Sequence, residues 1–341
     1  MTGNTLGWVI VAFVLYLLMM IAIGAFYAKG NNNSEDYFLG GRKLNGFVAA
    51  LSAQASDMSG WLLMGLPGAI YLTGVGGDGW IAIGLFIGTT LNWLFIATKL
   101  RRYTIRANNS VTLPTYFENR FHDEKKVLMT VSSITIVVFF LVYCASALSA
   151  GGQLFESVFG IDYHVALTIG ALVVLVYTFL GGFTAVCVTD FIQGMLMLVG
   201  ILAVPLFAYH FLTSGGATLS ESLEASGADS ANFLNLMKNG DGSNNIVSVI
   251  SGLGWGLGYF GMPHILVRFM AVRDEKEMTK SKATAISWVA LSLGFAVFIG
   301  ILGRAYLPEL VNGNNEKVFI EMIKKVFTVE MRAPFIAGLF L

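Results

Sequence analysis

Long apolar segments, separated by short polar ones, recur along the whole chain. A segment of about 20 apolar residues is long enough to cross the hydrocarbon core of a bilayer as an α-helix. Such segments lie near residues 8–28, 46–74, 79–98, 127–150, 164–181, 189–211, 247–268 and 284–306, and a ninth starts near residue 333 and is cut short at Leu341. The pattern predicts an all-α polytopic membrane protein with one transmembrane domain over residues 1–341, and a chain that is truncated at its C-terminus.

Two of these segments are interrupted by residues that weaken a helix. The segment 46–74 contains SDMSG at 56–60 and a Pro-Gly pair at 67–68, and the segment 247–268 reads SGLGWGLGYFGMPH over 251–264. Backbone groups freed by a break persist in a bilayer only where protein or water satisfies them. Five crossings separate the two broken segments, so these helices run in opposite directions. This arrangement predicts an inverted-repeat transporter, its second repeat incomplete, with the binding site at the breaks.

Composition and charge agree with a membrane protein and suggest its orientation. Hydrophobic residues make up 55% of the chain and charged residues 12%, whereas a soluble domain carries about a quarter charged residues. The net charge is zero, so no nucleic-acid partner is expected. Fifteen of the 21 Lys and Arg, Arg268 among them, face inward if the N-terminus lies outside, as the positive-inside rule favours. The polar segment 212–246 is then an extracellular loop of a protein in the cell membrane, with room for a short amphipathic helix.

No side chains are spaced for catalysis or for chelating a metal. Cys144 and Cys187 are the only cysteines, and both lie in or beside apolar segments, where cysteine packs as a small apolar group. The four histidines are scattered without ligand spacing. We therefore expect a protein that is not an enzyme, with no disulfide and no structural metal.

Asp57 is the only charged residue of the segment 46–74. A carboxylate inside a bilayer costs at least about 2.5 kcal/mol, and such groups normally face a cavity, an ion or a partner. One interpretation is binding or gating of an ion or solute; the other is capping of a half-helix that starts at the break, and the two can coexist. Hard cations prefer oxygen ligands, which the carbonyls of an unwound turn and the hydroxyls of Ser56 and Ser59 supply.

A second carboxylate and an arginine also have two interpretations each. Asp190 lies at the start of the segment 189–211, with Gln193 three residues later. This pattern fits a capping box or a residue of an ion pathway. Arg42, in YFLGGRKLNG just before the second segment, is either an anchor on the positive side of the membrane or part of a gate.

Aromatic residues accompany the second break. Trp255 and Tyr259 are four residues apart, on one face if helical, and suit either the wall of a small-solute pocket or ordinary packing. GLGYFG at 256–261 formally matches GxGxxG, but it lies in a membrane segment without a preceding strand, so no dinucleotide site is predicted. Tyr143 precedes the small residues of 145–151, and it either packs in the bundle or joins the pocket.

Six longer motifs together resemble the solute:sodium symporter family. They are DYFLGGRKL (36–44), SDMSGWLLMGLPGAIYLTG (56–74), LPTYFENRF (113–121), YCAS (143–146), GGFTAVCVTDFIQ (181–193) and GWGLGYFGMPHILVRFMA (254–271). The resemblance implies a LeuT-type fold, with two inverted five-helix repeats preceded by one extra N-terminal helix. It also implies sodium-coupled symport of a small amino acid by alternating access. In the branch whose motifs match, that solute is L-proline.

The resemblance also implies roles for single residues. The backbone carbonyls of Ala55 and Met58 bind the co-transported sodium, with Asp57, Ser59 and Gly60 important around it. Asp190 matches an acidic position linked to sodium in relatives with a second ion site, and Arg42 matches an arginine tied to coupling. Four residues match positions tied to substrate binding: Tyr143, Trp255, Tyr259 and Pro263.

Two residues depart from the family pattern. Gln54 stands where a small residue is expected, Met262 stands where glutamine is expected, and both flank the expected pocket. The Ser and Thr sodium ligands of the ninth helix are expected beyond Leu341. Three alternatives remain open at this point: symport of another amino acid, a carboxylate or a sugar, a uniport channel, and a symporter-like sensor. The oligomeric state is open as well.

Overall fold

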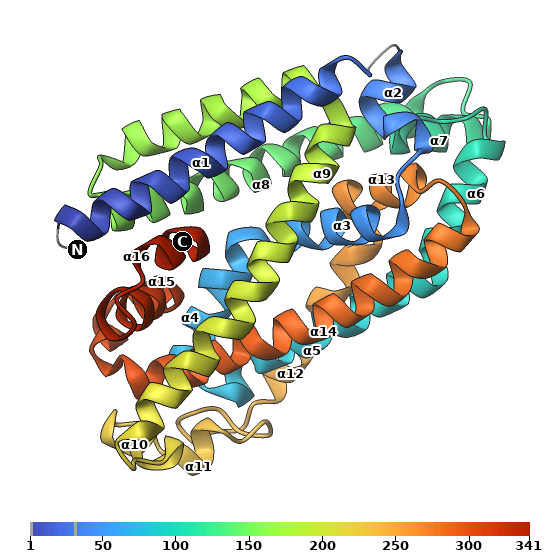
Figure 1. Cartoon of the computed structure of the whole chain (residues 1–341). Coiled ribbons are helices and arrows are strands. Elements are labelled where there is room, and N and C mark those ends of the chain that lie inside the picture. The colour runs from blue at the N-terminus through green and yellow to red at the C-terminus, as the bar shows by residue number, and fades with distance from the viewer. Residues whose placement is uncertain (1–2, 31–32) are drawn as a thin grey trace.

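The computed structural model describes residues 3–30 and 33–341, which form a bundle of helices (Figure 1). The α-helices are α1 (Gly3–Ala28), α2 (Ser34–Leu39), α3 (Gly46–Gly60), α4 (Leu66–Thr73), α5 (Val75–Leu91), α6 (Thr98–Arg106), α7 (Leu113–Phe121), α8 (Val127–Phe159), α9 (Tyr163–Ser214), α10 (Leu219–Ala225), α11 (Ser230–Phe233), α12 (Ile246–Trp255), α13 (Pro263–Ala271), α14 (Glu275–Tyr306), α15 (Val318–Ile323) and α16 (Pro334–Phe340). Short 3-10 or π-helical turns complete them: η1 (Gly40–Arg42), η2 (Trp61–Gly65), η3 (Asn92–Ala97), η4 (Gly256–Phe260), η5 (Pro308–Asn312), η6 (Asn315–Lys317) and η7 (Lys324–Glu330).

Several helices are long and apolar enough to cross a membrane. Within the described residues five pass on length and composition: Leu6–Ala28, Val75–Arg106, Val127–Phe159, Tyr163–Ser214 and Glu275–Tyr306. A sixth crossing is the pair Ile246–Phe260 and Pro263–Ala271, bent by 44°. The predicted all-α membrane protein with several crossings is therefore confirmed.

Helix α9 joins two segments that the sequence pattern had separated. Its 52 residues have a summed helical rise of about 78 Å at 1.5 Å per residue. This is more than twice the hydrocarbon core of about 30 Å. Gly182, with φ 61° and ψ −159°, interrupts the helical geometry, and Figure 1 shows the two parts running in different directions. The boundary expected between the segments 164–181 and 189–211 is thus a kink at Gly182, because one glycine with positive φ redirects the chain without ending its helix.

Both interrupted segments are broken in the structure. Ser59, with φ 32° and ψ −140°, leaves the helical region inside α3, and the π turn η2 and α4 follow it. In the second segment η4 ends at Phe260, and Pro263 begins α13. The fixed φ and missing N–H of proline suit the first turn of a helix. Because α13 packs against α3, the two breaks meet inside the molecule.

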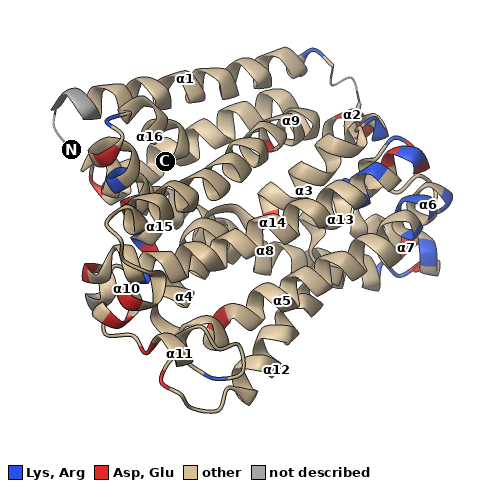
Figure 2. Cartoon of the chain, turned by 60° about the horizontal axis from the view of Figure 1, so that its bottom comes forward, with Lys and Arg blue, Asp and Glu red and all other residues tan. Residues whose placement is uncertain are grey.

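One end of the molecule is basic. Figure 2 shows Lys and Arg gathered around α2, α6 and α7, and we call this region the basic end. Here Leu44 N–H donates to Ala271 O (3.2 Å), and Arg273 N–H donates to Leu44 O (2.9 Å). Helix α3 therefore begins, and α13 ends, at the basic end, so that these two half-helices run antiparallel, as inverted repeats require.

The segment 212–246 lies at the opposite end and contains α10 and α11. Thr218 and Glu221 form a capping box at the start of α10, in which each side chain accepts from the other residue's backbone N–H. The hydrogen bonds with Thr218 lower the pKa of the Glu221 carboxyl. The short helix for which the polar segment had room is therefore fixed by local hydrogen bonds.

Glycines bring α5 into backbone contact with the second broken segment. A Cβ on Gly88 would lie 2.2 Å from the carbonyl oxygen of Gly256, and one on Gly84 would lie 2.2 Å from that of Gly252. Small residues four apart allow membrane helices to approach this closely. Helix α5 therefore fixes the position of the segment that carries Trp255 and Tyr259.

We predict that Gly88→Ala destabilises the folded protein. The added methyl group meets backbone, which cannot rotate away as a side chain can, and overpacking of this kind costs about 1–3 kcal/mol. The expected fall in Tm is about 5 °C, measured by thermal unfolding in detergent. Gly294→Ala is the matched control, because a Cβ there has nothing within 4 Å. Equal Tm values for the two variants would contradict the prediction.

Candidate functional site

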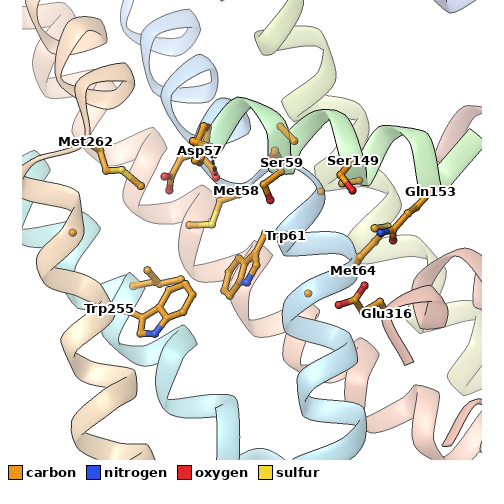
Figure 3. Close-up of a pocket in the computed structure, with 18 of the residues that line it drawn as sticks. Asp57, Met58, Ser59, Trp61, Met64, Ser149, Gln153, Trp255, Met262 and Glu316 are labelled. Atoms are coloured by element: carbon orange, nitrogen blue, oxygen red, sulfur yellow. Dashed lines mark hydrogen bonds between the residues drawn. The ribbon is translucent and has the colours of Figure 1, made fainter. Parts of the chain in front are cut away.

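A cavity of about 540 Å³ lies where the two breaks meet. Figure 3 shows Asp57, Met58 and Met262 at one part of it, Trp61 and Trp255 beside them, and Gln153 and Glu316 at another. Helix α8 and the turn η6 supply Gln153 and Glu316. Since α8 and α14 both start at the basic end, these two residues lie toward the opposite end. The cavity thus extends from the breaks away from the basic end.

The break in α3 frees carbonyl groups that α8 partly satisfies. The Tyr143 hydroxyl donates to Ser56 O (2.9 Å) and lies 3.2 Å from Asp57 O. Met58 O accepts from Trp61 N–H. Tyr143, which the sequence left between packing and pocket, therefore lines the cavity and contacts the break. Carbonyl oxygens at an unwound turn are ligands that suit sodium.

Asp57 places a buried carboxylate at the cavity. Its side chain is 5% exposed, and its Oδ1 lies 3.4 Å from His264 Nε2, near enough for an ion pair but not aligned for a hydrogen bond. The His264 ring stacks on Tyr143, with ring centres 5.3 Å apart. Among the described residues no Lys or Arg pairs with Asp57. A cation in the cavity would therefore offset a charge that is costly to bury.

Three aromatic side chains shape the cavity next to Asp57. Trp255 and Trp61 stack with ring centres 5.7 Å apart, one from each broken segment. Tyr259 is 4% exposed, and its backbone oxygen accepts from Asn92 Nδ2 (2.8 Å). The arrangement gives a flat apolar surface beside polar backbone, which is typical of sites for small amphipathic solutes.

Some of the other residues expected near the pocket line the cavity, and some do not. Met58, Ser59, Gly60 and Met262 line the cavity, and Pro263 does not. Ala55 and Gln54 do not line it either; Ala55 packs toward α9, where a Cβ on Gly194 would lie 3.3 Å from the Ala55 Cβ. The Gln54 side chain is 1% exposed within the core.

Asp190 is buried beside Ser56, outside the residues that line the cavity. It lies inside α9, eight residues beyond the Gly182 kink, so the capping-box interpretation is wrong. Its Oδ2 accepts from Ser52 Oγ (2.7 Å) and Ser56 Oγ (2.8 Å) and pairs with Arg268 Nη2 (2.9 Å). Arg268, which the charge pattern had assigned to a loop, is 5% exposed within α13.

Arg42 is the last residue of η1 and is buried at the basic end. The length of α3 separates it from the cavity. Arg42 is 8% exposed and donates to Met270 O (2.8 Å) and Ser110 O (2.8 Å), as well as to Asn109. Burial lowers the pKa of its guanidinium, which nevertheless stays charged, as arginine does in proteins. Arg42 thus lies at the basic end, as expected of an anchor on the positive side, and its hydrogen bonds tie α13 to the loop between α6 and α7.

The sequence profile of the sodium:solute symporter family matches residues 37–341. The chain belongs to this family. The resemblance seen in its motifs is thereby confirmed over almost its whole length.

Curated relatives and a solved structure give the same picture. The chain is 45% identical to the sodium/proline symporter of Salmonella typhimurium and 44% identical to that of Escherichia coli, in both cases over 97% of this chain and 64% of the relative. It is 42% identical to the sodium/proline symporter of Staphylococcus aureus, over 93% of this chain and 60% of the relative. A substrate-bound, outward-open Na+-coupled sialic acid symporter matches with a TM-score of 0.77 at 20% identity, over 98% of this chain and 70% of that one. The predicted LeuT-type fold is confirmed, and the chain spans about 64% of the length of its first relatives.

Sequence reasoning missed the side chains that contact the two buried carboxylates, His264 beside Asp57 and Arg268 beside Asp190. Both lie in GMPHILVRFMA directly after the second break. A signal was present, since a polar residue within one or two turns of a break faces the interior more often than lipid. Their partners, Asp57 and Asp190, come from other helices, and only the fold brings them together.

Proposed function

We propose that the protein containing this chain couples the entry of sodium to the uptake of a small amino acid, L-proline, across the cell membrane, with its N-terminus outside. One observation carries the proposal. The cavity at the two helix breaks combines the carboxylate of Asp57, which lacks a Lys or Arg partner in the described residues, with the aromatic surface of Trp255 and Tyr259. Family membership and the names of the relatives support this assignment.

Sodium would bind first, at oxygens of the break in α3. Ala55 and Met58 would supply carbonyls, Asp57 would supply the compensating charge, and Ser59 and Gly60 would shape the turn. The bound ion would hold residues 55–60 in one geometry and so order the adjacent Trp61 against Trp255. Solute binding is then favoured, because an ion that binds one conformation more tightly stabilises every contact made in that conformation.

The solute would lie between Trp255 and Tyr143. Proline carries an apolar ring and two charged groups, and the cavity presents an indole face next to polar groups of the break. An ammonium group suits the carboxylate side of the cavity, and the ring suits the indole face. Pro263 would act indirectly, by beginning α13 and so fixing the end of the second break.

Uptake by the full-length protein in proteoliposomes tests the proposal. We expect labelled proline to accumulate only with an inward sodium gradient, and proline to compete better than other amino acids, carboxylates or sugars. Accumulation that ignores the sodium gradient would indicate a uniporter and contradict the proposal. Sodium-driven uptake of another solute in preference would contradict the substrate alone.

A further inference from the structure

We propose that Arg268 is the resident cation of Asp190, and that this ion pair closes the route from the cavity to the basic end. The inference rests on the proposed symport and adds a part to it. Release of solute toward the basic end then requires the pair to separate. We call the Asp190–Arg268 ion pair the latch. Asp190 belongs to this closure and is not a ligand for a second sodium ion, as the family resemblance suggested.

The hydrogen bonds leave Asp190 Oδ2 fully occupied. Arg268 donates from Nη2 to Asp190 Oδ2 (2.9 Å) and to Ser56 Oγ (2.7 Å), and from Nε to Ser52 Oγ (2.9 Å). Both serine hydroxyls in turn donate to Asp190 Oδ2. Arg268 also donates from Nη1 to His264 O (2.6 Å). The network ties α3, α9 and α13 together.

Asp190 and Asp57 differ in how their buried negative charges are compensated. Asp190 is 7% exposed and Arg268 5% exposed, so each ion is the compensation that the other needs in a medium of low dielectric constant. A sodium ion at Asp190 would have to share the site with the Arg268 guanidinium, which already pairs with Asp190 Oδ2 at 2.9 Å. Asp57 has no Lys or Arg partner in the part of the chain that the structure describes, and is thus the carboxylate that remains for the transported cation.

The position of the pair suits a closure. The His264 ring lies beside Asp57, which lines the cavity, while the His264 carbonyl oxygen accepts from Arg268 one helical turn further along α13. Toward the basic end, Met270 O of the same helix accepts from Arg42. Of the described residues that line the cavity, none belongs to the pair or lies beyond it. Two arginine-centred layers therefore separate the cavity from the basic end.

Ser56 connects the latch to the proposed ion site. Its hydroxyl belongs to the Arg268–Asp190 network, and its carbonyl oxygen accepts from Tyr143 in the cavity. The next residue is Asp57. A change of backbone geometry at the break, which sodium binding or release would produce, therefore acts on the latch through one residue.

Cys187 is a native reporter for this closure. It is a free cysteine, 0% exposed, and lies on α9 one turn before Asp190. The experiment uses the full-length protein with its other cysteines, including the exposed Cys144, replaced by alanine. The measured quantity is the rate at which N-ethylmaleimide alkylates Cys187 in the absence of sodium and proline.

Arg268→Gln should raise the alkylation rate at least about tenfold, because labelling follows the population of the open state. Arg268→Lys keeps the charge and should restore most of the protection. Arg304→Gln is the matched control, since Arg304 contacts Ser226 at the opposite end. Unchanged labelling in Arg268→Gln, or an equal rise in Arg304→Gln, would overturn the latch. If the glutamine variant does not fold, Asp190→Asn removes the other charge of the pair and should raise the rate as well; unchanged labelling in a folded Asp190→Asn variant would overturn the proposal.

Equilibrium binding of radioactive sodium tests whether Asp190 is paired with Arg268 or binds a second sodium ion. We expect a single ion per protein, and the same number in Asp190→Asn. Two ions in the wild type and one in Asp190→Asn would overturn the inference. Absence of any sodium binding by a folded wild type would instead contradict the proposed symport, and the Cys187 measurement would still decide the latch.

Discussion

Proline uptake by an Asp57→Ala variant is half-saturated only at a sodium concentration about 10- to 100-fold above that of the wild type. Asp57 and Glu316 are the acidic residues among those that line the cavity, and Glu316 lies away from the break. Loss of an interaction with a charged group costs about 1.5–3 kcal/mol, and each 1.4 kcal/mol is a factor of ten in affinity. The measurement is the initial rate of uptake as a function of sodium concentration.

Two further variants distinguish the loss of the Asp57 charge from structural damage caused by the substitution. Asp57→Glu keeps the charge and should retain part of the sodium response, whereas Asp57→Asn keeps an oxygen but should behave like alanine. Asp78→Asn is the matched control, because Asp78 accepts from Thr73 at the start of α5 and does not line the cavity. A wild-type sodium response in Asp57→Asn would exclude Asp57 from the ion site.

Trp255→Ala should raise the KM for proline by about 30-fold and the KM for sodium much less. Trp255 stacks on Trp61 and forms the apolar side of the cavity. Truncation of a tryptophan that anchors a ligand costs about 2 kcal/mol or more, which corresponds to this factor. The two constants are measured in the same preparation, each with the other solute at saturation.

Aromatic variants and a distant tryptophan serve as controls. Trp255→Phe keeps an aromatic face and should be closer to the wild type. Tyr259→Ala should act like Trp255→Ala, since both side chains line the cavity. Trp8→Ala, on α1 and packed against Phe335, should leave both constants unchanged. Equal increases for proline and sodium in Trp255→Ala would indicate general damage and refute the assignment to substrate.

The membrane segments and their breaks were predictable because both depend on residues close together in sequence. A run of about 20 apolar residues is sufficient for a crossing in any context, and Ser-Gly and Gly-Pro clusters weaken a helix wherever they occur. The opposite orientation of the two broken segments followed from a count of crossings. The form of the boundary between the segments 164–181 and 189–211 was not predictable, because a glycine with positive φ can either bend a helix or end one.

Pairing between helices was not predictable from local pattern. Asp190 was expected to cap a helix or serve an ion pathway, and its partner Arg268 was assigned to a loop. In the structure their side chains meet at 2.9 Å between residues 78 positions apart. Arg42 was likewise read as an anchor on the positive side of the membrane or part of a gate, and only the structure shows its hydrogen bonds to Met270 of α13 and to Ser110 in the loop between α6 and α7.

The sequence by itself determined that this chain is a helical membrane protein with two oppositely directed broken helices and a carboxylate at the first break. Hydrophobicity and helix-breaking residues act locally, so their effect can be read along the chain. Only the tertiary structure decided which buried charge is already balanced. Asp190 has an arginine and two serine hydroxyls from neighbouring helices, while Asp57 faces a cavity beside a histidine. The cost of a buried charge depends on what surrounds it in space, and packing of distant segments sets those surroundings.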